Sequence, residues 1–510
     1  MGYILSLVIV FPLIAALFAF IVDEKSIRAY SLIVSFIEFC FTILVWINFS
    51  SEISVIQMME FIPLINSLNV NYHLGVDGIS LFLIVLSSFI VFVSLISLTI
   101  KDRLKHIIIS ILFLEMTMMG VFLSLDAILF YTFWELSLLP MFYIIGSWGS
   151  GKRIYAAVKF FIYTFFGSMF MLVGILTMSY LSYKTTGYYS FNILEWQNLN
   201  LPTSTQIWIF LAFFIAFAIK TPMFPFHTWL PYAHGQAPTV GSILLAAILL
   251  KMGTYGFVRF LLPMFPDASV YFSDFISIIA IIMIIYTSFI AFGQKDIKQI
   301  IAYSSIAHMG VIVLGVFSMS IEGISGAIFL MISHGVISGG LFMLIGFLYE
   351  RRHTKILSEF GGIAKTMPIY ATLFCIVLLG SIGLPLTMGF PGEFLSLLGI
   401  FKVNPIYAFL GGFGIIMGAI YSMNLFKLTF FGPITKTENR NLKDLNISEL
   451  FAIVPIVFLT IFLGIYPNLL LTNIDKSVQN SIFFMYQKTD NNTTKSYIEN
   501  SNTKRSLDVK

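Results

Sequence analysis

Residues 207–219, IWIFLAFFIAFAI, form an apolar run that ends at Lys220 and is followed by the helix-breaking stretch TPMFPFH at 221–227. A second run, GSILLAAILL at 241–250, leads into Lys251. Apolar runs of this kind predict helices that cross a lipid bilayer. Because an ammonium group at the bilayer centre costs roughly 3 kcal/mol or more, each lysine needs a partner or water inside the protein. Lys220 and Lys251 therefore predict an ion or proton pathway; a purely structural ion pair is the alternative.

The composition excludes a soluble globular domain. Of the 510 residues, 58% are hydrophobic and only 11% are charged, and the mean hydropathy is +0.92. The first apolar segment, residues 2–22, has the length of a full span and is read as a retained helix rather than a cleaved signal. The net charge of +4 is spread over loops and tail and gives no nucleic-acid signature. Cys40 and Cys375 lie in apolar runs and suggest neither a disulfide framework nor a metal site.

Apolar runs recur along the chain and predict an all-α, polytopic membrane protein with about fourteen transmembrane helices. The seventh and twelfth helices are predicted to be broken. The spans are expected near 2–22, 29–49, 78–100, 107–125, 127–149, 154–183, 206–230, 239–262, 271–292, 297–319, 322–348, 367–400, 405–431 and 448–472. The remainder, 473–510, is a polar tail rich in Asn, Thr, Ser and Lys that is predicted to be disordered.

Basic residues alternate between successive loops. One set of loops carries nearly all of them, and the opposite set carries only Lys184 and Lys402. The positive-inside rule places the basic set on the cytoplasmic side, or the matrix side in a mitochondrion, and both termini on the other side. The basic set comprises Lys25, Arg28, Lys101, Arg103, Lys105, Lys152, Arg153, Lys295, Lys298, Arg351, Arg352, Lys355, Lys365, Lys436, Arg440 and Lys443.

An internal repeat is indicated by matching positions about 163 residues apart. An offset of five helices inverts the second copy relative to the first, and paired inverted repeats with broken helices are typical of transporters. The predicted divisions are N-terminal helices 1–106, repeat A at 107–262, inverted repeat B at 271–431, a last helix at 448–472 and the tail 473–510.

Several ionisable side chains are expected at mid-depth on successive helices, where bridging waters and long side chains would join them into a lateral polar axis. Core hydrogen bonding is the alternative for the histidines. Two further histidines, His227 and His234, fall in a loop-like stretch where packing or capping competes with proton transfer. The proton-transfer candidates are Glu135, Lys220, Lys251, His308, His334 and Glu393, with Glu115 and Glu38 as secondary candidates.

The predicted helix breaks have a physical role. Proline removes a backbone donor and frees carbonyl groups, which are tolerated in a membrane where they are buried in protein or line a hydrated cavity. Lys220 and Glu393 stand at the edges of these breaks, so water and protons are expected to reach them there. The breaking residues are Pro222, Pro225, Pro385 and Pro391.

The sequence gives no indication of a redox or nucleotide-binding site. The chain has no CxxC, G-x-G-x-x-G or P-loop pattern in a strand–helix context, and no clustered ligands at metal-binding spacing. The chain is therefore expected to bind no cofactor or metal of its own and to carry out no redox chemistry itself.

Three segments resemble the antiporter-like subunits of respiratory complex I: FYTFWELSLLPMFYIIGSWG at 130–149, the stretch 219–260 around PFHTWLPYAHGQAPTVGSILLAAILLKMG, and GLPLTMGFPGEFLSLLG at 383–399. The resemblance extends over spans three to thirteen. Glu393 stands where the L and N subunits typically carry lysine, and the chain lacks the long lateral helix of subunit L. Tyr232 departs from the aspartate of many relatives.

The resemblance implies proton translocation coupled to quinone reduction elsewhere in a large complex. It implies that Glu135 and Lys220 form a modulating pair, that Lys251 is the central carrier, that His308 and His334 link the half-channels, and that Glu393 is the terminal carrier. FMN, iron–sulfur clusters and quinone are expected in partner subunits. The expected partners are L-type and N-type membrane subunits and the lipid bilayer, with no nucleic acid.

The expected location is a bacterial inner membrane, or alternatively a mitochondrial inner membrane, with both termini on the periplasmic side. The alternative function is that of a subunit of a multi-subunit cation/proton antiporter, which shares the fold. Co-purifying flavin and iron–sulfur absorbance would distinguish the two.

Overall fold

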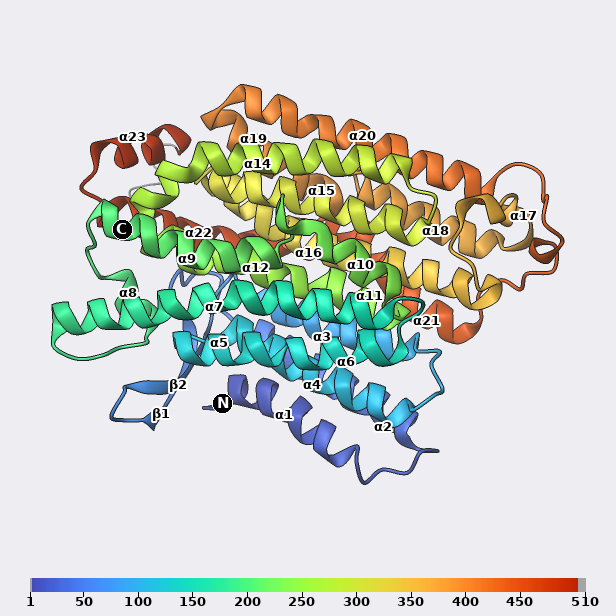
Figure 1. The fold of residues 1–510 in the computed structure, drawn as a ribbon, viewed down its shortest axis with the longest axis horizontal. Coiled ribbons are helices and arrows are strands. Elements are labelled where there is room, and N and C mark those ends of the chain that lie inside the picture. Colours follow the sequence, from blue (N-terminus) through green and yellow to red (C-terminus); the bar gives the residue numbers. More distant parts are fainter. Residues whose placement is uncertain (1, 503–510) are drawn as a thin grey trace.

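The computed structural model describes residues 2–502 and is almost entirely helical (Figure 1). Its first half contains α1 (Ile4–Phe18), α2 (Ile27–Asn48), β1 (Gln57–Ile65), β2 (Val70–Val76), α3 (Leu81–Ile96), α4 (Leu104–Leu123), α5 (Ala127–Leu136), α6 (Leu138–Trp148), α7 (Arg153–Thr186), α8 (Ile193–Gln197), α9 (Thr203–Lys220), η1 (Phe226–Thr228) and α10 (Trp229–Gln236). Next come α11 (Thr239–Leu244), η2 (Leu245–Leu249), α12 (Leu250–Gly256), η3 (Phe257–Leu261), α13 (Leu262–Met264), α14 (Pro266–Gly293), α15 (Ile297–Phe317) and α16 (Ile321–Arg352). The last part contains η4 (Leu357–Glu359), α17 (Ile363–Thr366), α18 (Pro368–Ser381), α19 (Gly389–Val403), α20 (Pro405–Phe430), η5 (Thr437–Asn439), α21 (Ile447–Ile465), α22 (Asn468–Lys488) and α23 (Asn492–Ser501).

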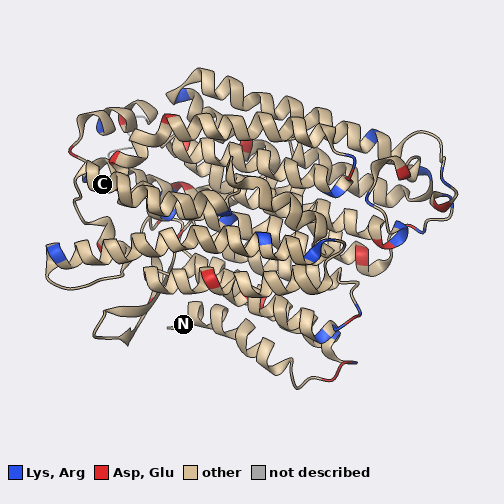
Figure 2. Ribbon diagram, in the orientation of Figure 1, with Lys and Arg blue, Asp and Glu red and all other residues tan. Residues whose placement is uncertain are grey.

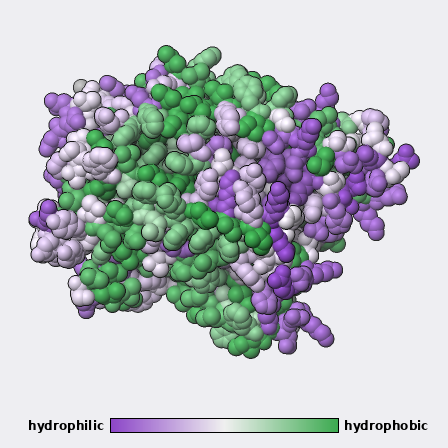
Figure 3. All heavy atoms as spheres, viewed as in Figure 1, coloured by the Kyte–Doolittle hydropathy of each residue, from purple (hydrophilic) through white to green (hydrophobic). Residues whose placement is uncertain are grey.

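Within the described residues, eleven helical segments are long and apolar enough to cross a membrane. They are α2, α4, α5 with α6, α7, α9, α11 to α13, α14, α15, α16, α20 and α21. The shorter apolar helices α1, α3 and α18 lie among them. Figure 3 shows an apolar belt between two hydrophilic ends, as expected of a chain whose surface meets lipid. The prediction of a mostly helical protein with many membrane-spanning helices is confirmed, although the chain also contains one β-hairpin.

Helix α16 lies at the centre of the bundle. All of its most apolar window is buried, and it contacts α15, α19, α11, α18, α21 and α3. Because it is surrounded by protein rather than lipid, its polar residue His334 faces other side chains and not the bilayer.

Two spans are interrupted near the middle of the bundle. Helix α9 ends at Lys220, and regular helix resumes at η1 and α10, with Pro222 and Pro225 in the gap. Helices α18 and α19 are separated by residues 382–388, which include Pro385.

Pro391 lies outside that gap, and its prediction as a helix-breaking residue is wrong. It occupies the first turn of α19, which begins at Gly389. Proline is tolerated in a first turn, because no intrahelical partner is available there for a backbone N–H. Glu393 consequently lies inside α19 rather than at its edge.

The span that carries Lys251 contains two π-helical turns. The turns η2 (Leu245–Leu249) and η3 (Phe257–Leu261) flank the α-helical segment α12. Such single π turns widen a helix locally and occur frequently at functional sites.

A β-hairpin, which the sequence pattern did not predict, follows α2. Strands β1 and β2 pair antiparallel. Glu60 on β1 accepts hydrogen bonds from the amides of Leu5 (2.7 Å) and Ser6 (3.0 Å), which are free donors at the start of α1. The hairpin thereby caps α1 and connects two distant parts of the chain.

The prediction of a disordered tail is wrong for residues 473–502. Helix α22 buries an apolar face that includes Leu471, Ile474, Val478, Ile482 and Met485, a spacing that places these side chains on one side of a helix. Helix α23 follows, and residues 503–510 of the predicted tail lie outside the described part of the chain.

The loops of the basic set lie together at one end of the bundle. Figure 2 shows Lys and Arg gathered at the end that also carries α17, whereas the hairpin, α8 and α23 lie at the opposite end. The two ends are called below the basic face and the opposite face.

Candidate functional site

A series of ionisable side chains, six of them buried and two (Glu135 and His308) half-buried, crosses the bundle from α2 to α19. Each comes from a different helix, and most of these helices contact the next one in the series directly or through an adjoining turn. Lys220, Lys251, Glu38 and Glu115 are at most 1% exposed. The series is Glu38 (α2), Glu115 (α4), Glu135 (α5), Lys220 (α9), Lys251 (α12), His334 (α16), His308 (α15) and Glu393 (α19).

Lys251 is bonded directly to the next member of the series. Its Nζ lies 2.7 Å from His334 Nδ1 and donates to the Ala246 carbonyl oxygen at 2.5 Å. Ala246 belongs to the π turn η2, so the irregular turn supplies a backbone acceptor for the lysine. A proton on Nζ therefore has a direct acceptor in the imidazole whenever Nδ1 is unprotonated.

Beyond Lys251, the series of ionisable groups continues with two histidines and a carboxylate. The His334 and His308 ring centroids are 5.5 Å apart. His308 Nδ1 lies 3.1 Å from Glu393 Oε1, and Ser381 Oγ lies 3.5 Å from His308 Nε2. The path from Lys251 to Glu393 thus consists of two direct contacts and one gap between the imidazoles.

A small polar cavity occupies that gap. It measures about 10 Å³, the size of a single water molecule, and it is bordered by His308, His334 and Glu393. Five serines also line it: Ser304, Ser305, Ser333, Ser338 and Ser381. Among the described side chains, His334 Nε2 and the hydroxyls of Ser305 and Ser333 have no protein hydrogen-bond partner. These groups suit a hydrogen-bonded bridge between the two histidines.

Lys220 and Glu135 interact without touching. The two groups are close enough to act on each other electrostatically, but within the described residues no ion pair joins them, and Lys220 Nζ has no hydrogen-bond partner. The ammonium instead lies 5.2 Å from the ring centre of Trp134 and 5.8 Å from that of Phe160. Aromatic faces attract a cation without accepting its proton.

Glu38 and Glu115 form a second carboxylate pair beyond Glu135. They interact electrostatically with one another, and none of their four carboxyl oxygens has a hydrogen-bond partner in the described part of the chain. This pair extends the polar series towards α2.

Two buried basic residues that were not among the predicted site residues connect Lys251 with the basic face. His234, fully buried in α10, stacks on Phe342 with ring centres 4.5 Å apart. It lies close enough to both Lys298 and Lys251 for electrostatic interaction. The loop-like reading of residues 227–234 is wrong, because His227 lies in η1 and His234 in α10.

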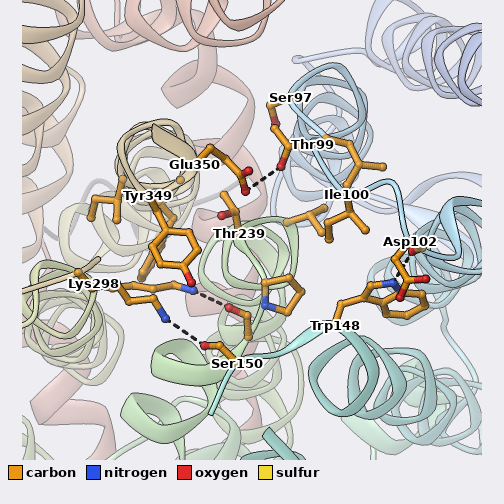
Figure 4. Close-up of a pocket in the computed structure, with 18 of the residues that line it drawn as sticks. Ser97, Thr99, Ile100, Asp102, Trp148, Ser150, Thr239, Lys298, Tyr349 and Glu350 are labelled. Atoms are coloured by element: carbon orange, nitrogen blue, oxygen red, sulfur yellow. Dashed lines mark hydrogen bonds between the residues drawn. The ribbon is translucent and has the colours of Figure 1, made fainter. Parts of the chain in front are cut away.

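Lys298 lies at the inner wall of a pocket of about 420 Å³ (Figure 4). Its Nζ donates to the Ala237 carbonyl at 2.6 Å, and the side chain is buried, although the sequence grouped it with the loop lysines. Asp296 is the N-cap of α15 and accepts from the Lys298 amide at 2.8 Å. The predicted span 297–319 already includes Lys298, so its helical position could be predicted, whereas its burial depends on how α15 packs against α10.

Other residues of this pocket come from the loops of the basic face. Lys355 donates to the Gly235 carbonyl at 2.9 Å and to Ser150 Oγ at 3.2 Å, and burial lowers its pKa. Glu350 accepts a hydrogen bond from Thr99 at 3.0 Å. The pocket is therefore lined in part by polar and charged groups of the basic face.

The described residues contain no group of three or more His, Cys, Asp or Glu side chains arranged to hold a metal ion. Cys40 is exposed and Cys375 is half-buried, and neither forms a disulfide.

Comparison with known proteins places these features in context. Residues 124–418 match the family described as NADH:quinone oxidoreductase/Mrp antiporter, transmembrane. NADH-quinone oxidoreductase subunit M of Rickettsia prowazekii is 47% identical over 485 residues, covering 94% of this chain and 98% of that protein. NADH-ubiquinone oxidoreductase chain 4 of Marchantia polymorpha is 41% identical, with 94% and 97% covered.

Solved structures show the same architecture. A chain of respiratory complex I from Thermus thermophilus superposes with a TM-score of 0.86 at 29% identity, covering 95% of this chain and 99% of that one. A chain of the Mrp complex from Dietzia superposes with a TM-score of 0.82 at 17% identity, covering 97% and 99%. The second likeness shows a shared fold alone.

Proposed function

The chain belongs to the NADH:quinone oxidoreductase/Mrp antiporter family of membrane subunits, and from this premise we propose that it is a subunit M-type, proton-translocating subunit of NADH:quinone oxidoreductase. In this role it works as part of an enzyme complex and contributes proton movement across the membrane. The resemblance read from its sequence motifs is confirmed by relatives that match nearly the whole chain.

The series from Lys251 to Glu393, with two direct contacts separated by one water-sized cavity, carries this proposal. Lys251 Nζ and His334 Nδ1 are 2.7 Å apart, and His308 Nδ1 and Glu393 Oε1 are 3.1 Å apart. Both distances lie within reach of direct proton transfer. A proton received at His334 Nδ1 allows release of the Nε2 proton into the serine-lined cavity, from which His308 passes one to Glu393.

Protons enter from the basic face. The pocket of about 420 Å³ leads to Lys298, His234 lies between Lys298 and Lys251, and Lys251 begins the direct contacts. Glu393 is the last ionisable group of the series and is proposed as the terminal carrier. The route is therefore lateral for most of its length, with entry and exit at different helices.

Glu135 and Lys220 act as a modulating pair. Since no hydrogen bond joins them, the charge state of Glu135 reaches Lys220 through its electric field. A proton moved against 100 mV costs about 2.3 kcal/mol, and field changes of that order decide in which direction protons flow.

The topology proposed for this function has fourteen spans and two inverted five-helix repeats. The eleven long spans and the three shorter apolar helices supply that number. The interrupted spans α9–α10 and α18–α19 fall at corresponding places in repeat A (107–262) and repeat B (271–431). The basic face is proposed to be cytoplasmic, or matrix in a mitochondrion, with both termini on the other side.

The partners are proposed to be the L-type and N-type membrane subunits, with FMN, iron–sulfur clusters and the quinone site held by other subunits. The membrane is proposed to be a bacterial inner membrane, or a mitochondrial one. The likeness to the Mrp complex, at 17% identity, supports a shared fold. By itself it does not support an antiporter function for this chain.

Affinity purification through a tag on this chain tests the proposal. Co-purified flavin and iron–sulfur absorbance, with NADH-driven proton uptake after reconstitution into liposomes, is the expected result. Purification of a complex without flavin that exchanges sodium for protons would contradict it and identify a cation/proton antiporter.

A further inference from the structure

A buried ion pair lies at the end of the Lys251 span that is remote from the basic face. Arg259 Nη2 donates to Asp77 Oδ1 at 2.6 Å, and both side chains are almost fully buried. Arg259 Nε also donates to the Tyr255 hydroxyl at 3.0 Å. Asp77 is fixed in turn by the backbone amides of Ile79 and Ser80, each at 3.1 Å.

Tyr255 stands between this pair and Lys251. Lys251 and Tyr255 are four residues apart within α12 and therefore share one helix face. The Tyr255 hydroxyl is fully committed, since it accepts from Arg259 and donates to the Phe122 carbonyl at 3.1 Å. The three side chains form a column that descends from the proton carrier towards the opposite face.

A polar pocket of about 260 Å³ reaches the lower end of that column. Asp77 and Arg259 form part of its wall, together with Gln197, Asn198 and Asn480. Its other walls come from the segment before β1, from α8 and from α22, which lie at the opposite face in Figure 1. Water from that face can therefore approach the guanidinium, while Lys251 lies about two helical turns further in.

We propose that the Arg259–Asp77 pair is an electrostatic barrier that prevents protons from passing between Lys251 and the opposite face. The inference rests on the proposed function, in which Lys251 holds a proton and must deliver it laterally. Arginine keeps its charge at all accessible pH values, and a fixed arginine excludes protons and cations from other membrane pores.

The geometry gives the barrier a direction. The guanidinium contacts Tyr255 on the side of Lys251, whereas the carboxylate is held at the start of α3. Any proton leaving Lys251 downwards therefore meets the positive end of the pair first. The purely structural alternative is that the ion pair only holds α3 and η3 together. In that case, removing the pair from a protein that still folds would not change its proton permeability.

The size of the effect follows from the spacing. Eight residues at a rise of about 1.5 Å put Lys251 and Arg259 about 12 Å apart along the helix. At that separation and an effective dielectric constant of about 20, one charge changes the equilibrium for placing a second by about tenfold.

The test uses Asp77→Asn combined with Arg259→Gln in the intact complex. This change removes both charges without leaving one buried and unpaired. The complex is reconstituted into liposomes, a pH gradient is imposed without NADH, and its decay is followed. We expect decay about twofold faster than for the native complex, because the opposite charges of the pair largely cancel at this distance, and decay at the native rate in an assembled double variant would overturn the proposal.

Two further variants separate the barrier from the structural alternative. Arg259→Lys retains the positive charge and is expected to keep the native leak rate, whereas Arg259→Gln alone, which removes only the positive charge, is expected to leak about tenfold faster than the native complex. The single change also provides the test if the double variant does not assemble. Leak in Arg259→Lys equal to that in Arg259→Gln would contradict a role for charge.

The route of the leak is tested by adding Lys251→Ala to the double variant, which is expected to return the decay to the native rate. Persistent leak would show that it bypasses Lys251 and would overturn the barrier proposal. The proposed function fails by a different result, namely normal NADH-driven pumping by Lys251→Ala alone, so the two failures are distinguishable.

Discussion

Between Lys251 and Glu393 two pairs of groups are in direct contact, whereas Glu135, which is half-buried, and Lys220, which is buried, have no direct contact with each other. In the first region Lys251 and His334 are 2.7 Å apart, and His308 and Glu393 are 3.1 Å apart. In the second, Lys220 lies against aromatic rings. Proton transfer needs contact, while an electric field acts over several ångströms. The contact region is therefore suited to carry protons, and the field region to control when they move.

The largest effect is expected at Lys251, where entry from the basic face joins the contact region. Lys251→Ala removes the donor to His334 and should reduce NADH-driven proton uptake to background in an assembled complex. Lys251→Arg should fail as well, because a guanidinium hardly releases its proton. Both variants are tested by measuring proton uptake by the reconstituted complex. Normal uptake in the Ala variant would contradict the role of Lys251 as a proton carrier in the contact region.

The next largest effect is expected at the other end of the contact region. Glu393→Gln keeps the size of the side chain but cannot load a proton, so most pumping should be lost. Glu393→Lys restores a titratable group and should recover a measurable fraction. Glu322→Gln is the matched control, since this carboxylate pairs with Lys402 near the surface, 2.5 Å away, and lies outside the series.

Glu135→Gln is expected to impair pumping severely, though less than loss of Lys251. The change removes the charge that acts on Lys220 through its electric field. Quinone reduction and proton uptake measured on the same preparation give the ratio of protons to electrons. A ratio equal to that of the native complex would reduce the pair to a structural role.

A smaller effect is expected at the inlet. Lys298→Ala leaves the pocket and the contacts from Lys251 to Glu393 in place but removes the charged group at the inner wall. Slower pumping with an unchanged endpoint is expected, because water in the pocket can still deliver protons when the positioned group is removed. Lys295→Ala, an exposed neighbour in the preceding loop, should pump at the native rate, and equal effects of both changes would remove Lys298 from the route.

Much of the architecture could be predicted from the sequence, because long apolar runs leave few alternatives to membrane helices. The charged residues inside those runs were visible for the same reason. The hairpin was missed because its alternation is weak, and α22 because its polar composition obscured a regularly spaced apolar face. The π turns beside Lys251 have no signal in a hydropathy pattern.

The site was predictable residue by residue but not in its connections. Depth along a helix indicated Lys251, His334, His308 and Glu393, yet which pairs touch depends on how helices rotate against each other. Lys298 was missed because it was counted among the basic residues of the loops, although it falls inside the predicted span 297–319, and its burial depends on packing between helices. Arg259 was missed because its partner Asp77 is 182 positions away in the chain.

The most direct test shortens the two glutamates by the same single methylene group. Glu393→Asp withdraws the carboxylate from His308, whereas Glu135→Asp leaves a negative charge close to Lys220. NADH-driven proton uptake in matched reconstituted complexes should then fall sharply for Glu393→Asp and be retained in large part for Glu135→Asp. Equal losses at the two positions, or a greater loss at Glu135, would contradict the division into a contact region and a field region.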